Sequence, residues 1–276
     1  YGIQTNITYK INIPSGKSLS VYSDIDISYL NYGGINPSTS TITINNETLN
    51  LYDTILYLKV SPDISSNANI QFYYPEKIKR VGIFVTKESA PLYDLLIKHQ
   101  SGEIFCEIPF VISNHQYLEN IVSHFQIPFY HFPIYPNSKL EQEEQIQILI
   151  DRENVDLLVL ARYMQILSPE FVGKYHGRII NIHHGFLPAF KGGDPYRQAW
   201  ERGVKMIGAT AHYVTADLDE GPIIVQDVVS VSHHHSVKEM VQAGRDIERR
   251  VLTSAVKAHL QHRIILDGQR TIIFHP

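Results

Sequence analysis

The sequence is poor in cysteine, in excess charge and in long apolar runs, and each shortage excludes a class of protein. Cys106 is the only cysteine among 276 residues, so no intrachain disulfide can form, and its place in an apolar strand-like segment indicates core packing. The 24 basic and 28 acidic residues are dispersed without a basic stripe, which argues against nucleic acid as a partner. No apolar run reaches the roughly 18 residues that span a bilayer, and no export signal opens the chain. We therefore expect a soluble, cytoplasmic protein with no membrane partner.

Residues 1–79 differ in amino-acid composition from the rest of the chain, because they are rich in Ile, Asn, Ser, Thr and Tyr. Three alternating segments, ITYKINIP, STSTITI and ILYLKV, predict half-buried strands. A short helix face is predicted from four apolar residues after the first of these segments: Leu19, Tyr22, Ile25 and Tyr29. The polar stretch SPDISSNANIQ and then Pro75 mark the end of this region. We expect a small α+β domain over 1–79.

From residue 80 onward, short apolar strands alternate with amphipathic helices, which is typical of βαβ units and a parallel sheet. The predicted strands are RVGIFV (80–85), CEIPFVIS (106–113), FYHFPI (129–134), DLLVLAR (156–162) and RIINIHH (178–184). The predicted helices between them are APLYDLLIKHQ (90–100), YLENIVSHF (117–125), KLEQEEQIQILIDRE (139–153) and SPEFVGKYHG (168–177). The fold class is therefore α/β, with a mostly parallel Rossmann-type sheet and flanking helices in a domain over 80–276.

Two longer β segments, MIGATAHYVT (206–215) and GPIIVQDVVSVS (221–232), follow and predict an antiparallel excursion of the sheet. A long helix is expected after them. Ser236 and Glu239 have the spacing of a capping box at its start, and apolar residues recur on one of its faces.

Polar side chains finish the strand RIINIHH, where ligands of an open α/β sheet bind. Alternation along the strand places Asn181 and His183 on one face and turns Ile182 into the core. An amide and an imidazole side by side can both donate to one developing oxyanion. Asp219 lies in the loop between the two long β segments, which can fold back over this strand end and supply a base. The three side chains predict acid–base chemistry on a carbonyl group.

Four stretches carry a family resemblance, in matching order and spacing: LARYMQILSPEFV (160–172), INIHH with FLPAF (180–190), ERGVKMIGATAHYVT (201–215) and DLDEGPIIVQDV (217–228). On these motifs, residues from about Arg80 to Phe274 resemble the formyltransferase family. Within it, ARYMQILS, the doubled His of NIHH, and GATAHYVT followed by LDEGPI look like the deformylase branch.

The resemblance implies hydrolysis of 10-formyltetrahydrofolate to formate and tetrahydrofolate, which supplies formate for purine synthesis and balances the one-carbon pool. It implies that Asn181, His183 and Asp219 are the catalytic set, with water as nucleophile and no metal or tightly bound cofactor. The order of proton transfer between His183 and Asp219 stays open. It also implies that the pterin ring binds against two segments, whose residues are Met164, Gln165, Ile166, Leu167, Val214, Thr215, Ala216, Asp217 and Leu218.

A folate-dependent transferase acting on an amine such as glycinamide ribonucleotide is the first alternative. Ribonucleotide formyltransferases have a glycine-rich turn after the first strand that cradles a phosphate with backbone N–H groups. This chain has Thr86, Lys87, Glu88 and Ser89 there, with no glycine in the segment after Gly82. The missing cradle favours water over a phosphorylated acceptor.

A second alternative is an inactive folate-binding or regulatory protein, against which the intact spacing of the three catalytic positions argues. The chain departs from the family motif beside them, with Gly185 in place of Ser and GGDP at 192–195 in place of a GANP-like sequence. These changes leave the catalytic groups in place and bear on pocket hydration or loop flexibility.

A metallohydrolase would need ligands such as His183, His184, His212 and Asp219. Neighbouring residues on a strand point to opposite faces, and neither HExxH nor paired cysteines are present, so no metal is expected. We place His184 and His212 in supporting positions; for His212, contact with the catalytic groups and simple hydrogen bonding within the strand are equally open.

Deformylases of this family carry an N-terminal ACT domain, a βαββαβ module, and the element order in 1–79 resembles its first half. IPSGKS replaces the usual turn after the first strand, so we expect a degenerate ACT-like domain. ACT domains pair through their sheets, which implies a homodimer or tetramer.

Overall fold

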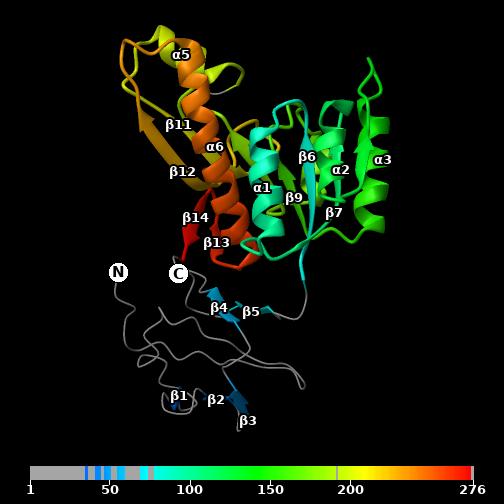
Figure 1. Cartoon of the computed structure of the whole chain (residues 1–276). Helices are drawn as coiled ribbons and strands as arrows, with labels where there is room; N and C mark the ends of the chain where they lie inside the picture. Colours follow the sequence, from blue (N-terminus) through cyan, green and yellow to red (C-terminus); the bar gives the residue numbers. More distant parts are fainter. Residues whose placement is uncertain are drawn as a thin grey trace. The chain divides into compact units, whose positions relative to one another are not determined.

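The computed structural model describes residues 78–190 and 192–274 and, before them, the backbone of five strands (Figure 1). These strands are β1 (Ile35–Asn36), β2 (Thr41–Ile44), β3 (Glu47–Asn50), β4 (Ile55–Lys59) and β5 (Asn69–Tyr73). β1 to β3 form an antiparallel sheet, and β4 pairs with β5. β2 and β4 confirm two of the predicted strands, whereas ITYKINIP and the predicted helix at 19–29 lie outside the described residues. The ACT-like assignment and the boundary after residue 79 stay predictions.

The second compact unit, Ile78–Ile273, is built around one seven-stranded sheet. Its strands are β6 (Arg80–Val85), β7 (Glu107–Ser113), β8 (Phe129–His131), β9 (Leu157–Leu160), β10 (Ile179–His183), β11 (Met206–Tyr213) and β12 (Ile223–Ser230). They lie in the order β12-β11-β10-β9-β6-β7-β8. The neighbours from β10 to β8 pair in parallel. β11 pairs antiparallel with both β10 and β12. The predicted mostly parallel sheet with an antiparallel excursion is confirmed.

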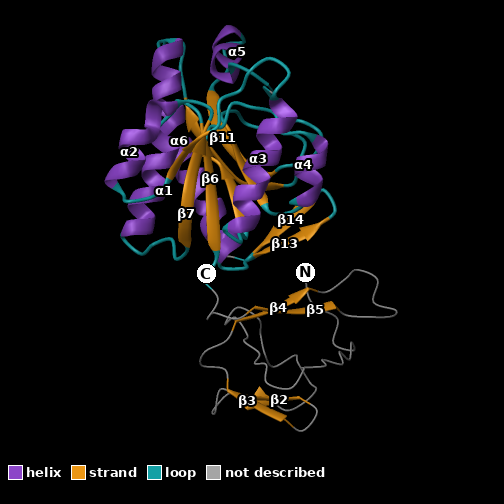
Figure 2. Ribbon diagram, turned by 90° about the vertical axis from the view of Figure 1, so that its right-hand side faces the viewer, coloured by secondary structure: helices purple, strands orange, loops and turns teal. Residues whose placement is uncertain are grey.

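Helices cover both faces of this sheet, as Figure 2 shows. They are α1 (Ala90–Gln100), α2 (Glu119–His124), α3 (Lys139–Arg152), α4 (Pro169–Lys174), α5 (Pro195–Glu201) and α6 (Val237–Leu260), with a 3-10 turn at Gln116–Leu118 before α2. Apolar residues of α1, α2 and α6 pack against strand residues on one face of the sheet and form a first core. Apolar residues of α3 and α4 pack against strand residues on the opposite face and form a second core. Burial on both faces explains why the parallel strands are nearly continuous apolar runs.

One helix and one hairpin of this unit were not predicted. α5 begins at Pro195, and its preceding residue Asp194 has a left-handed φ of 54°. The residues GGDP at this helix start are typical of a loop, so the sequence did not indicate a helix. The hairpin of β13 (Ile264–Asp267) and β14 (Arg270–Ile273) follows the long helix. Among the described residues, no helix has both the length and the apolarity to cross a bilayer.

The predicted capping box at the start of α6 is confirmed. Ser236 Oγ accepts a hydrogen bond from the Glu239 amide at 3.3 Å, and Glu239 Oε2 accepts one from the Ser236 amide at 2.8 Å. We expect Ser236→Ala to lower the free energy of unfolding by about 1 kcal/mol, because the helix loses its cap acceptor. Urea denaturation checks this. Ser254→Ala, on the exposed part of the same helix, should keep or raise stability, and equal losses in the two variants would contradict the prediction.

Candidate active site

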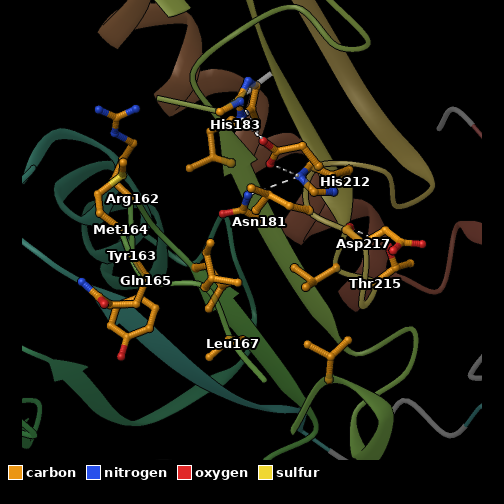
Figure 3. A pocket seen from close by; sticks show the side chains of 18 of the residues that line it. Arg162, Tyr163, Met164, Gln165, Leu167, Asn181, His183, His212, Thr215 and Asp217 are labelled. Atoms are coloured by element: carbon orange, nitrogen blue, oxygen red, sulfur yellow. Dashed lines mark hydrogen bonds and ion pairs between the residues drawn. The ribbon is translucent and has the colours of Figure 1, made fainter. Parts of the chain in front are cut away.

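Asn181 and His183 point to the same side of β10, at its carboxyl end, while Ile182 is buried in the core on the other side. Asp219 comes from the loop between β11 and β12, where it has a left-handed φ of 58°. His183 is 4% exposed and Asp219 6% exposed, so both titratable groups are shielded from bulk water. The fold thus brings together the three residues that alternation and the loop position predicted. Figure 3 labels two of them, Asn181 and His183.

Both ring nitrogens of His183 face hydrogen-bond acceptors. Nδ1 lies 3.3 Å from Asp219 Oδ2, and Nε2 lies 3.1 Å from the carbonyl oxygen of Phe190. A carbonyl oxygen and a carboxylate only accept, so the protonated imidazole satisfies both contacts. Asp219 Oδ2 also accepts from the Gly192 amide at 3.3 Å.

Burial by itself raises the pKa of Asp219, but its contacts outweigh this effect. The hydrogen bond and charge of His183, the Gly192 amide and His212 together hold the pKa of this carboxyl below its ordinary value. Asp219 is therefore an ionised acceptor at neutral pH.

His212, on β11, is tied both to the backbone and to the catalytic positions. Its Nδ1 donates to the carbonyl oxygen of Tyr213 at 2.9 Å, which leaves Nε2 as an acceptor for Asn181 Nδ2 at 3.2 Å. Burial lowers the pKa of His212, which keeps the ring neutral. Its Nε2 also lies 3.8 Å from Asp219 Oδ1. His212 is therefore hydrogen-bonded within the sheet and also contacts the Asn181 amide; its role as a supporting residue stays a prediction.

His184 turns toward other partners. Its ring centroid lies 5.5 Å from that of His183 and 5.9 Å from that of Tyr196, and burial lowers its pKa to about 3. It is therefore a neutral packing neighbour. Among the described residues, no group of three or more His, Cys, Asp or Glu side chains has a metal-binding arrangement.

A cavity of about 230 Å³ joins these groups to the two segments predicted to bind the pterin. All nine predicted residues of those segments line it, as do the catalytic set and both supporting histidines. The first segment is held in place at Met164, whose amide donates to Thr86 Oγ1 at 3.0 Å. The side chains of Met164, Ile166 and Leu218 are more than half exposed, so the cavity has an apolar rim.

Several lining residues were not predicted: Leu160, Arg162, Tyr163, Val172, Ile182, Gly192 and Gly193. Arg162 and Tyr163 stand inside the motif ARYMQILS, directly before the predicted pterin segment, and this adjacency was the signal available in the sequence. The other apolar members are strand and helix residues whose place at the cavity depends on packing.

Known proteins resemble this chain over most of its length. The family model described as Formyl transferase matches residues 79–256. A formyltetrahydrofolate deformylase of Synechocystis sp. is 50% identical over 207 residues, which cover 75% of this chain and 72% of the relative. The crystal structure of a formyltetrahydrofolate deformylase from Pseudomonas syringae pv. tomato matches with a TM-score of 0.74 and 46% identity, over 75% of this chain and 70% of that one.

Transferases are more distant in sequence. The crystal structure of glycinamide ribonucleotide transformylase 1 from Symbiobacterium toebii matches with a TM-score of 0.70 and 30% identity, over 74% of this chain and 98% of that one. The chain therefore belongs to the formyl transferase family, and the predicted likeness to its formyltetrahydrofolate deformylases is confirmed.

Proposed function

We propose that this protein hydrolyses 10-formyltetrahydrofolate to formate and tetrahydrofolate. The observation that carries the proposal is the meeting of Asn181, His183 and Asp219 at a cavity whose rim is formed by the two predicted pterin segments. The deformylases that it resembles are named for removal of this formyl group. The pterin ring binds between the segments 164–167 and 214–218, and the formyl group reaches the end of β10.

Water is the nucleophile in this reaction. Among the described residues, His183 and Gly192 engage Asp219 Oδ2, whereas Oδ1 has only a 3.8 Å approach to His212. Oδ1 is therefore the oxygen that orients the water and takes its proton. As the new C–O bond forms, the formyl oxygen becomes negative. Asn181 Nδ2 and His183 Nε2 donate to it, the latter in exchange for the Phe190 carbonyl. The C–N10 bond then breaks, N10 takes a proton, and formate leaves.

The segment after β6 supports water over a phosphorylated amine as acceptor. Thr86 Oγ1 donates to Asn114 Oδ1 at 3.1 Å and accepts from the Met164 amide, so this side chain is used within the protein. The Glu88 carboxylate accepts from the Ala90 amide at the start of α1 and pairs with Arg245 at 2.9 Å. A carboxylate at this helix start repels a phosphate where a transferase needs to hold one.

The proposal needs no tightly bound cofactor, because a carboxylate, an imidazole and an amide supply all the proton transfers and hydrogen bonds. Folate is its small-molecule partner. The homo-oligomeric state and the cytoplasmic location expected from the sequence stay predictions.

The test is to incubate the full chain with 10-formyltetrahydrofolate, with and without glycinamide ribonucleotide, and to quantify formate and formylated amine. We expect formate to be released at the same rate whether or not the amine is present. Formyl transfer to the amine would instead make the protein a transferase, and absence of both products would favour a folate-binding role.

A further inference from the structure

A buried ion pair beside the catalytic groups has unused hydrogen-bonding capacity. Among the described residues, four buried side-chain nitrogen or oxygen atoms make no hydrogen bond within the protein, and three of these belong to Arg162 and Glu248. The two side chains are 16% and 2% exposed, and Arg162 Nε lies 3.5 Å from Glu248 Oε2. Buried charges are normally well hydrogen-bonded, so the guanidinium of Arg162 is incompletely satisfied by its contacts within the described part of the protein.

Arg162 is held where it can reach the reacting group. It is the second residue after β9, has a left-handed φ of 64°, and lines the same cavity as Asn181 and His183. The backbone is fixed on both sides of it, since the Ala161 amide donates to the Phe84 carbonyl at 2.9 Å and the Met164 amide donates to Thr86. A strained arginine conformation kept between two fixed points is typical of a functional position. Figure 3 shows its guanidinium at the end of the cavity where His183 lies, away from Leu167.

The surroundings leave positive charge at this end of the cavity. Glu248 also accepts a hydrogen bond from the Tyr196 hydroxyl at 2.6 Å, so its charge is shared between two partners. Burial raises the pKa of Glu248, which further limits how well it neutralises Arg162. Glu88 raises and Arg245 lowers the pKa of Glu248, and these two residues form an ion pair with each other. His184, which is neutral, fills the space toward Tyr196.

We infer that Arg162 forms a subsite for the carboxylate product, formate, and for the negative charge that precedes it. This inference rests on the proposed hydrolysis. The water oxygen bonds to the formyl carbon, the C–N10 bond breaks and N10 takes a proton. The carbon leaves as formate, a carboxylate with two equivalent oxygens that keeps its C–H bond. The first proton of the water passes through Asp219 to N10, and the second goes to Asp219 and then to solvent. Transfer to an amine would leave a neutral amide, so a guanidinium at this place serves hydrolysis in particular.

Binding of formate tests the inference directly. The full chain with tetrahydrofolate bound is titrated with ¹³C-labelled formate and followed by NMR, for the wild type, Arg162→Met and Glu248→Gln. Loss of a charge-assisted contact should weaken formate binding about 10- to 100-fold in Arg162→Met. Glu248→Gln keeps Arg162 and removes its competing carboxylate, so its formate affinity should be kept or increased. Unchanged affinity in Arg162→Met, or an equal loss in both variants, would overturn the inference in favour of a purely structural ion pair.

Turnover provides a second readout. In Arg162→Met, kcat for formate release should fall about tenfold or more while KM for the folate stays within about twofold, because the lost contact is made only as charge develops. If Arg162→Met does not fold, Arg162→Lys replaces it. A lysine lacks the planar two-point geometry and should bind formate more weakly than the wild type; wild-type affinity would count against the subsite. A wild-type protein that releases no formate refutes the proposed function, whereas turnover with formate binding independent of Arg162 refutes only the subsite.

Discussion

Asp219→Asn is expected to lower kcat for formate release by about 10²- to 10⁴-fold, the range in which a positioned general base contributes. The amide keeps the size of the side chain but cannot take a proton from water. It also replaces the negative partner of His183 Nδ1, 3.3 Å away, with a neutral amide. KM for the folate should change little, because Asp219 lies at the reacting end of the cavity.

The pH profile separates this role from a structural one. Because the contacts of Asp219 hold its pKa below the ordinary value, the carboxylate is ionised at neutral pH and is lost only when the pH falls through that lowered pKa. The wild-type rate should therefore fall on the acid side, and Asp219→Asn should lack this limb. Asp246→Asn, an exposed carboxylate on α6, is the control and should keep wild-type turnover. Asp219→Asn with turnover near that of the wild type would refute the assignment of the base.

Gly221→Ala is expected to lower both stability and activity. A Cβ at this position would lie 1.7 Å from the carbonyl oxygen of Tyr213, a backbone atom that cannot move without separating β11 from β12. The same carbonyl accepts the hydrogen bond from His212 Nδ1, and the Tyr213 amide donates to the Pro222 carbonyl at 2.9 Å. The methyl group would break this corner and displace the loop that carries Asp219.

We expect Gly221→Ala to lower the free energy of unfolding by about 3 kcal/mol, the upper end for overpacking, because the clash is with backbone. Formate release should fall together with stability. Urea denaturation and turnover measure the two effects. Gly173→Ala is the matched control, because nothing lies within 4 Å of a Cβ there and α4 gains helix propensity. A Gly221→Ala protein with the wild-type urea midpoint and turnover would contradict the packing argument.

Local patterns predicted most of the α/β unit. Parallel strands buried on both faces are short apolar runs, and the helices between them show amphipathic spacing, so β6 to β12 and α1 to α4 were located from the sequence. α5 was missed because it has only seven residues and begins with a GGDP sequence that is typical of a loop. The hairpin of β13 and β14 was missed as well, because its strands have only four residues each.

The candidate site, like the fold, was predicted only in part. Asn181 and His183 were predicted to share a face because the period of a strand is two residues, and the family motif identified Asp219. The sequence could not predict that His212 contacts the Asn181 amide, since this contact joins β11 to β10 across the sheet. Nor could it predict the pairing of Arg162 with Glu248, which lies far along the chain on α6.

The sequence by itself determined the class of fold and the family, and it singled out the three side chains that we propose to be catalytic, because periodicity and motif spacing are local properties. Only the tertiary structure decided the distances on which the chemistry depends. The β11–β12 loop must fold over the end of β10 before Asp219 meets His183, and α6 must pack on the sheet before Glu248 meets Arg162. Hydrogen-bond direction and incomplete charge pairing arise from such long-range packing, which no local pattern encodes.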